Sequence, residues 1–377
     1  MTRQALLPRR VLTPSGFDMG RCVVIEGGTI AAVLPAAECP HDVERRELDG
    51  DLLPGFIDLQ VNGGGGMLFN DQPTVQGIAA IAAAHRRFGT TGMFPTLISD
   101  DLDVVAQAIA AVDEAIERGV PGVLGIHIEG PFLNAAKKGI HDASKFRALD
   151  AQAIDLLSSL KRGRTLVTLA PELAPPGAVR ALVERGVTVA AGHTNASYEE
   201  MRSALEDGLT GFTHLYNAMT QLGSRAPGAV GAALDDRDSW SGLIVDGHHV
   251  HPAALRIALA AKGAEHLVLV TDAMPTVGSA AKAFILNGQT IVADDGRCVS
   301  PDGTLAGSDL DMATAVRNAE RLMRVDQATA VRMASASPAY AMRMSDQRGE
   351  IRPGLAADLV LVDDAREVVE TWIAGRS

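Results

Sequence analysis

The sequence predicts an α/β fold, a (β/α)8 TIM-type barrel with a small β-sandwich domain built from both termini. Between residues 53 and 272, short apolar runs of β-rich composition alternate with alanine-rich segments of helical character. Polar residues able to do chemistry lie at the ends of many of these runs. A barrel has this arrangement, whereas the rival fold, a doubly wound open sheet, gathers such residues at one switch point.

Eight runs in this region are predicted strands, and crossover helices between them favour closure into a barrel. The strands are expected at residues 55–61, 91–97, 123–129, 166–170, 187–191, 211–214, 243–246 and 267–271. The helical segments that separate them include 76–87, 102–118, 178–185 and 252–262.

At both ends of the chain, the sequence predicts short strands joined by turns. Strands are expected at residues 21–26, 29–33, 357–363 and 368–373. Neither end has enough strands to be stable alone, so we expect the two to pack together. The predicted domains are a small β domain made of residues 1–53 and 346–377, and a metal-dependent barrel catalytic domain at 54–345.

Composition excludes several classes of partner. The formal net charge of −12 gives no electrostatic footprint for nucleic acid or an anionic membrane. No segment approaches the roughly 20 apolar residues of a membrane span, and no signal-peptide pattern precedes the barrel. Three cysteines far apart in the sequence fit reduced thiols. We therefore expect a cytoplasmic protein without nucleic-acid or membrane partners.

Three residues at the ends of different predicted strands form a candidate metal site. Glu129, His193 and His214 provide one carboxylate and two imidazoles, a good ligand set for a catalytic zinc. A single such residue is more often hydrogen-bonded structure than a ligand, but three on three strands favour a site. His127 lies deeper on the same strand face as Glu129, where a core or supporting histidine is expected.

Two further residues suit acid–base and oxyanion chemistry. Asp272 ends the last predicted strand, and a carboxylate beside an activated water can accept its proton and pass it to a leaving nitrogen. An aspartate in this position is also often a helix N-cap, so the companion residues decide its role. His141 can donate a hydrogen bond to an acyl oxygen. On local sequence alone, an exposed basic loop is the competing interpretation of His141.

Arg225 and His249 are candidates for holding an anionic group. The planar guanidinium of arginine suits phosphate, although a surface role is the common alternative for Arg225. Because the chain is acidic overall, a few local cations must hold any anionic ligand.

Five motifs together resemble the N-acetylglucosamine-6-phosphate deacetylase family of the amidohydrolase superfamily. They lie at 54–58 (PGFID), 127–132 (HIEGPF), 192–196 (GHTNA), 213–219 (THLYNAM) and 270–273 (VTDA). The resemblance covers nearly the whole chain and implies a barrel flanked by a β domain from both termini. It also implies that Glu129, His193 and His214 hold the metal, that Asp272 is the acid/base, and that His141 polarises the acetyl carbonyl.

The resemblance has further implications for the substrate and the metal count. Asn217 and the Ala218 backbone are implied to hold the sugar phosphate, with His249 nearby and Arg225 reaching in from the partner of a homodimer. Many superfamily members carry His-x-His after the first strand for a second metal, whereas this chain has Gln60-Val61-Asn62. Amides are poor zinc ligands, so we expect one divalent metal per subunit, with zinc as the expected ion.

The predicted activity is metal-dependent hydrolysis of the acetamide of N-acetyl-D-glucosamine 6-phosphate, in amino-sugar catabolism or cell-wall recycling. The expected partner is thus a small phosphorylated N-acetyl amino sugar. The nearest alternative is the galactosamine epimer. A hydantoinase- or dihydroorotase-like ring opener is disfavoured by the missing His-x-His. A catalytically inactive binding protein of this fold is disfavoured because the ligand and acid/base set is complete.

Overall fold

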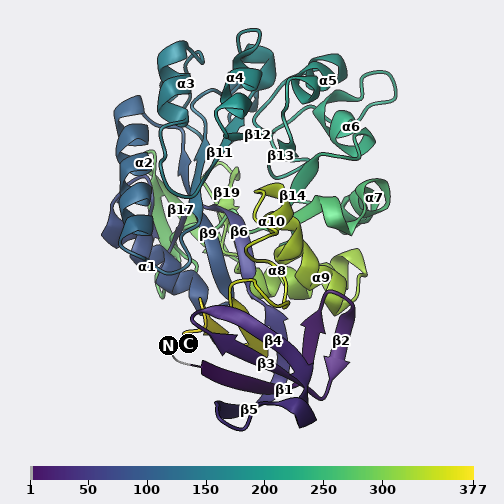
Figure 1. The fold of residues 1–377 in the computed structure, drawn as a ribbon. Helices are drawn as coiled ribbons and strands as arrows, with labels where there is room; N and C mark the ends of the chain where they lie inside the picture. The colour runs from purple at the N-terminus through teal and green to yellow at the C-terminus, as the bar shows by residue number, and fades with distance from the viewer. Residues whose placement is uncertain (1–2) are drawn as a thin grey trace.

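The computed structural model, which describes residues 3–377, confirms the barrel (Figure 1). Each predicted barrel strand overlaps an observed one, and all eight run parallel in sequence order. The ring closes where the amide of Asp272 donates to the carbonyl of Gln60 at 3.0 Å. The strands are β6 (Phe56–Val61), β9 (Thr90–Ile98), β10 (Gly125–Glu129), β11 (Arg164–Leu169), β12 (Thr188–Ala191), β13 (Gly211–Phe212), β14 (Trp240–Ile244) and β15 (Leu267–Val270).

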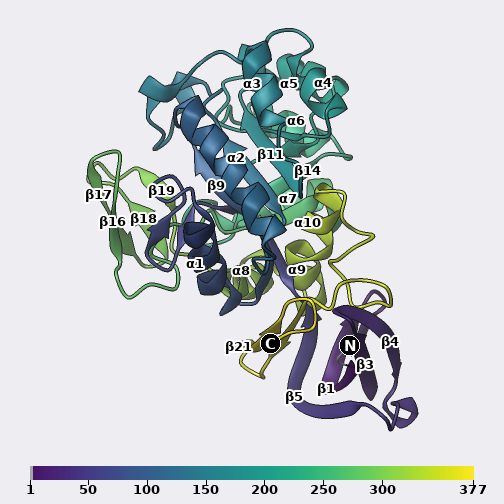
Figure 2. The same cartoon turned by 60° about the vertical axis from the view of Figure 1, so that its left-hand side comes forward.

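Helices cover the outside of the barrel (Figures 1 and 2). In α2, for example, Val105, Ile109 and Val112 recur at helical spacing and are buried. The helices are α1 (Val75–Arg86), α2 (Leu102–Glu117), α3 (Ala151–Leu157), α4 (Ala178–Glu184), α5 (Tyr198–Glu206), α6 (Gly228–Asp235), α7 (Pro252–Lys262), α8 (Met312–Asn318), α9 (Gln327–Ala334) and α10 (Ala336–Ala341). No helix within residues 3–377 is long and apolar enough to cross a lipid bilayer.

The two ends of the chain join in one seven-stranded sheet beside the barrel (Figure 2). β5 links them, because it pairs parallel with β1 and antiparallel with β20. Leu6, Leu52 and Trp372 belong to one apolar cluster shared by strands from both ends. This shared core supports our proposal that 1–53 and 346–377 form one domain and 54–345 the other. The strands are β1 (Arg3–Thr13), β2 (Gly16–Met19), β3 (Arg21–Glu26), β4 (Thr29–Pro35), β5 (Glu44–Pro54), β20 (Leu359–Val362) and β21 (Val368–Trp372).

A four-stranded antiparallel sheet follows the last barrel strand and was not predicted. It consists of β16 (Ala283–Leu286), β17 (Gln289–Asp294), β18 (Arg297–Val299) and β19 (Leu305–Ser308). Asn287-Gly288 and Asp295-Gly296 connect its first three strands, and all four residues have positive φ. Asn-Gly and Asp-Gly are strong hairpin signals, so the sequence did contain the information for this sheet.

Candidate metal and active site

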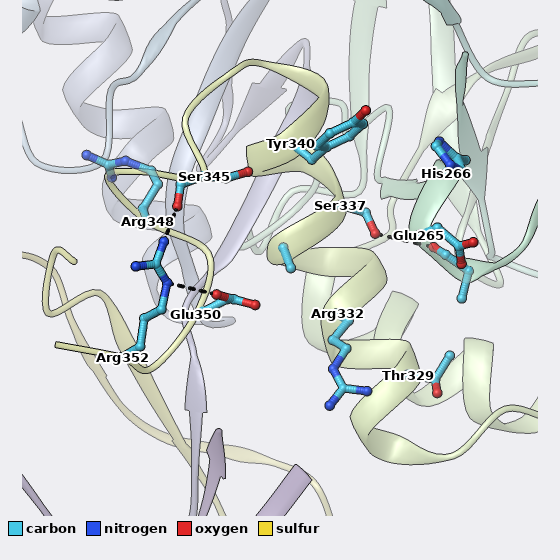
Figure 3. A pocket seen from close by; sticks show the side chains of 12 residues that line it. Glu265, His266, Thr329, Arg332, Ser337, Tyr340, Ser345, Arg348, Glu350 and Arg352 are labelled. Carbon is cyan, nitrogen blue, oxygen red and sulfur yellow. Dashed lines mark hydrogen bonds and ion pairs between the residues drawn. The ribbon is translucent and has the colours of Figure 1, made fainter. Parts of the chain in front are cut away.

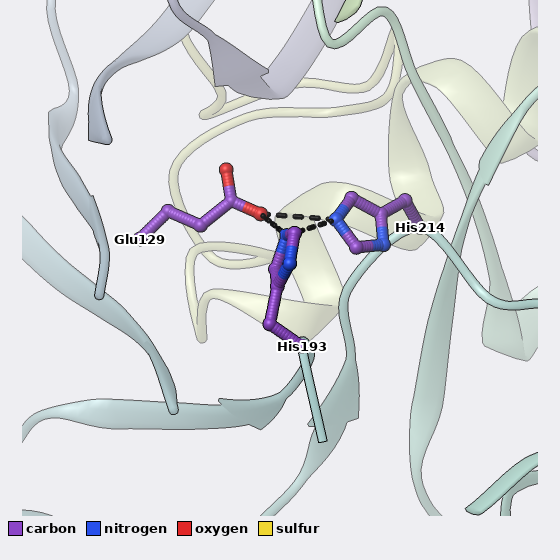
Figure 4. A group of neighbouring side chains, drawn as sticks. All are labelled: Glu129, His193 and His214. Carbon is purple, nitrogen blue, oxygen red and sulfur yellow. Dashed lines mark hydrogen bonds and ion pairs between the residues drawn. The ribbon is translucent and has the colours of Figure 1, made fainter. Parts of the chain in front are cut away.

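Three predicted ligands converge at the carboxyl-terminal mouth of the barrel (Figure 4). Glu129 ends β10, while His193 and His214 each lie two residues beyond the ends of β12 and β13. The Nε2 atoms of His193 and His214 lie 3.2 and 3.0 Å from Glu129 Oε1, and 3.1 Å from each other. All three side chains are buried. The structure therefore gathers residues that are up to 85 positions apart in the chain.

The donor set fits a divalent cation. His193 Nδ1 donates to the carbonyl of Lys137 at 2.8 Å, which leaves the Nε2 lone pair directed at Glu129 and His214. Burial opposes ionisation of Glu129, but its close contacts with the two imidazoles hold its pKa well below the usual value. Ligand atoms of a tetrahedral zinc are about 3.3 Å apart, close to the spacing of these three atoms. A group of buried lone pairs facing one another is suited to a bound cation.

Strained backbone at the strand ends turns several of these side chains inward. His193 (φ 48°), His214 (φ 32°) and Asp272 (φ 52°) occupy the left-handed region. Such conformations are uncommon for residues other than glycine and gather at functional sites. Ala218 (φ 48°), beside the predicted sugar-phosphate position, does the same.

Asp272 lies beside the three ligands and is held by two amides. Gln60 Nε2 donates to Asp272 Oδ1 at 3.0 Å and to Glu129 Oε2 at 3.1 Å, and Asn62 Nδ2 donates to Asp272 Oδ1 at 2.6 Å. Burial, reinforced by the charge of Glu129, raises the pKa of Asp272 to about 6. Both amides bind the same carboxylate oxygen, so Oδ2 stays available for proton transfer.

His141 is buried, and the alternative of an exposed basic loop is wrong. Its ring centroid lies 4.4 Å from that of His193, and its Nδ1 lies 2.8 Å from Ser99 Oγ. Burial, together with the nearby His193, lowers the pKa of His141 to about 3, so the ring is neutral at physiological pH.

The three predicted metal ligands, Asp272 and His141 surround one cavity of about 250 Å³. Asn217, Ala218 and His249 line it as predicted, whereas Arg225 is exposed and does not line the cavity of its own chain. His249 is oriented by Asp246, whose Oδ2 lies 2.6 Å from His249 Nδ1. Residues from β19 and the segment before it also reach the cavity. The lining residues absent from the predicted site are Asn62, Ile98, Gly139, Ile140, Ile244, Met274, Thr304, Leu305 and Gly307.

A larger cavity, of about 530 Å³, lies beside α9 and α10 (Figure 3). Its arginines are largely paired: Arg348 with Asp358 at 2.6 Å and Arg352 with Glu350 at 3.0 Å. Within residues 3–377, the group able to hold a metal lies at the smaller cavity instead. The volume of a cavity therefore does not identify the functional site. The convergence of reactive side chains at the smaller cavity does.

Comparison with known proteins agrees with this geometry. Residues 52–377 match the Amidohydrolase family. The chain is 44% identical over 369 residues to the N-acetylgalactosamine-6-phosphate deacetylase of Shewanella sp. (strain ANA-3), covering 97% of this chain and 93% of the relative. It is 34% identical over 358 residues to the N-acetylglucosamine-6-phosphate deacetylase of Haemophilus influenzae, covering 94% and 93%.

Solved structures give the same result. N-acetylglucosamine-6-phosphate deacetylase from Pasteurella multocida superposes with a TM-score of 0.95 at 32% identity, over 99% of this chain and 98% of the other. A mutant of the Mycobacterium smegmatis enzyme in complex with N-acetyl-D-glucosamine-6-phosphate gives 0.90 at 29% identity, over 100% and 99%. The chain belongs to the amidohydrolase family, within its group of N-acetylglucosamine- and N-acetylgalactosamine-6-phosphate deacetylases.

Proposed function

We propose that this protein hydrolyses the acetamide of N-acetyl-D-glucosamine 6-phosphate to D-glucosamine 6-phosphate and acetate, in amino-sugar catabolism or cell-wall recycling. The observation that carries the proposal is the convergence of Glu129, His193 and His214 with Asp272 and His141 around one cavity. Each partial reaction of amide hydrolysis thus has a residue within reach. Three free, buried cysteines support a cytoplasmic location.

One divalent metal per subunit, proposed to be zinc, would be held by Glu129, His193 and His214. When bound, it would polarise the acetyl carbonyl and make a water molecule acidic enough to react at neutral pH. The side-chain amides of Gln60 and Asn62 donate hydrogen bonds to the carboxylates of Glu129 and Asp272, so these two residues do not provide ligands for a second metal. This supports a single metal.

The side chains then divide the proton transfers between them. Asp272 Oδ2 accepts the proton of the attacking water as its oxygen bonds to the acyl carbon. His141 donates a hydrogen bond to the acyl oxygen while negative charge develops there. Asp272 returns the proton to the sugar nitrogen as the C–N bond breaks, which restores the carboxylate. The second proton of the water passes from the new carboxylic acid to the amine, so acetate and the protonated amine are released.

The phosphate end is proposed to lie against Asn217, the Ala218 backbone and His249. Asp246 accepts from His249 Nδ1, so His249 Nε2 donates to an anion when both ring nitrogens carry hydrogens, as in the imidazolium form. Arg225 is exposed on a loop of its own chain. We propose that in a homodimer it contacts the phosphate of the substrate bound in the partner subunit's site. One arginine per site would suit an acidic protein that must bind an anion locally.

The galactosamine epimer is a second candidate substrate, favoured by one specific observation. The relative that shares 44% identity with this chain is an N-acetylgalactosamine-6-phosphate deacetylase. The two sugars differ only in the orientation of one hydroxyl group. The acetamide and the phosphate would therefore meet the same residues in either case.

The deciding experiment measures acetate released from both N-acetylhexosamine 6-phosphates and from unphosphorylated N-acetylglucosamine, with bound metal counted per chain. We expect turnover of the phosphorylated sugars alone, with a higher kcat/KM for the glucosamine form, and about one metal per subunit. A higher kcat/KM for the galactosamine form would transfer the assignment to the epimer. No acetate from metal-loaded protein would overturn deacetylation itself.

A further inference from the structure

Ser99 holds the unreactive side of the His141 ring. Ser99 follows β9 directly, and both residues are buried, with exposed fractions of 7% and 4%. The Ser99 backbone N–H donates to His141 Nδ1 at 3.3 Å, and Ser99 Oγ lies 2.8 Å from the same atom. One residue thus contacts His141 Nδ1 twice.

The backbone N–H favours a proton on Nε2, and the hydroxyl, at the shorter distance of 2.8 Å, strengthens that preference by donating to the same Nδ1 atom. A peptide N–H can only donate, so His141 Nδ1 must offer its lone pair. A neutral imidazole has one N–H, which therefore lies on Nε2. In residues 3–377, His141 Nε2 has no hydrogen-bond partner, and the ring lines the cavity. The hydrogen needed for the acyl oxygen is thereby placed on the cavity side.

The surroundings make room for the Ser99 hydroxyl and fix its position. A Cβ atom at Gly130 would lie 2.2 Å from Ser99 Oγ, so a larger residue there would displace the hydroxyl. The amide of Asn70 donates to the carbonyl of Ile98 at 3.0 Å, and its oxygen accepts from the Ile98 N–H at 3.1 Å. These two hydrogen bonds fix the position of Ile98, the last residue of β9, directly before Ser99.

We propose that Ser99 is a positioning residue for the deacetylation, because its hydroxyl and backbone N–H hold His141 as the Nε2–H tautomer with that hydrogen directed at the acyl oxygen. The inference rests on the proposed function for its kinetic consequence. Its structural part, the tautomer of His141, stands independently. Without the hydroxyl, the backbone N–H alone would hold Nδ1, and the ring could rotate or change tautomer.

Kinetics of Ser99→Ala test the proposal. We expect kcat to fall about ten-fold and KM to change less than about two-fold, because an oxyanion contact acts in the transition state rather than in substrate binding. Ser99→Thr, which restores the hydroxyl, should recover most of the loss. Ser335→Ala is the matched control, since Ser335 is a buried serine that does not line the cavity and whose hydroxyl donates to the Val331 carbonyl at 2.7 Å. Its kcat should be unchanged.

A double-mutant cycle tests whether Ser99 acts through His141. In a His141→Asn background, Ser99→Ala should cost no further activity, because the group it positions is already gone. The deficit of Ser99→Ala should also shrink on the N-trifluoroacetyl substrate, whose carbonyl needs less polarisation. An equal, independent loss in both backgrounds would overturn the proposal.

A spectroscopic readout separates failure of this inference from failure of the proposed function. Nitrogen NMR of protein labelled with ¹⁵N-histidine distinguishes protonated from unprotonated ring nitrogens without any substrate. We expect His141 of the wild type to be the Nε2–H tautomer, and the Ser99→Ala variant to show a mixture. An Nδ1–H wild type would overturn the inference even if the enzyme is active. The expected tautomer would support it even if another substrate is found.

Discussion

The side-chain amide of Gln60 donates a hydrogen bond to Asp272 Oδ1 at 3.0 Å, and the same nitrogen reaches Glu129 Oε2 at 3.1 Å. One NH₂ group therefore separates the buried carboxylate of Glu129 from the half-buried carboxylate of Asp272, which would otherwise repel each other. Because Gln60 lies in β6 and bridges both carboxylates, this amide orients the acid/base relative to a metal ligand.

Gln60→Ala removes this link. We expect kcat to fall about ten-fold and zinc affinity to weaken about ten-fold, since groups that orient metal ligands typically contribute this much. Steady-state kinetics and zinc titration with a competing chelator measure both quantities. Gln289→Ala, at the start of β17, is an exposed control. Unchanged kcat and zinc affinity would show that the amide only fills space.

Asp272→Asn tests the acid/base assignment. The amide keeps the shape of the side chain but cannot carry the proton from water to the leaving nitrogen. We expect turnover to fall about 10³-fold or more while the melting temperature and the zinc content stay close to wild type. Activity assays with thermal melts and metal analysis give these values. Near-normal turnover would contradict the assignment.

Zinc should stabilise the folded protein through the three-ligand site. At a free concentration about 100-fold above Kd, binding adds about 2.7 kcal/mol to the free energy of unfolding, which should raise the melting temperature. His214→Ala should lose this response. Calcium, which prefers six to eight oxygen ligands, is the matched control ion and should stabilise neither protein. Equal zinc responses in both proteins would argue against the site.

Lys262 predicts a pH dependence of stability. Its buried ammonium donates to the carbonyls of Ala233 at 2.9 Å and Asp236 at 2.6 Å, and burial lowers the pKa of Lys262 to about 8. Between about pH 8 and 10.4 the unfolded chain keeps this proton while the folded chain releases it. The free energy of unfolding therefore increases as the pH rises through this range.

The variant Lys262→Met isolates this effect. The stability difference between wild type and variant should move in favour of wild type by about 2 kcal/mol from pH 8 to 10. Urea unfolding of both proteins at about pH 7.5, 9 and 10 measures it, and the comparison cancels all other titrating groups. A difference independent of pH would contradict the shift.

Arg225 predicts complementation between subunits. If it serves the partner's phosphate, Arg225→Ala and Asp272→Asn homodimers are each defective, but a hybrid dimer contains one intact site. Mixing and reassembling the two in equal amounts should restore about a quarter of wild-type activity, since half of the dimers are hybrids with one site each. Activity that never exceeds the sum of the separate variants would contradict a shared site.

Local sequence determined the barrel and most of its site. Apolar runs and helical segments predicted every barrel strand, because strand and helix periodicities are local properties. Glu129, His193, His214 and Asp272 could be proposed from the sequence because polar residues at the ends of parallel strands must meet at one mouth. The resemblance added the substrate class, which the similar deacetylases support.

Only the tertiary structure decided the distances and the supporting contacts. From the sequence alone, an exposed loop was a competing interpretation of His141, whereas the folded structure buries it against Ser99, 42 residues away. The sheet formed by β16–β19 reaches the cavity although it lies in a segment with no predicted strands. Such contacts join residues that are far apart in the chain, so no local pattern of hydrophobicity or turns encodes them. They follow from barrel closure, which sets where each strand end lies.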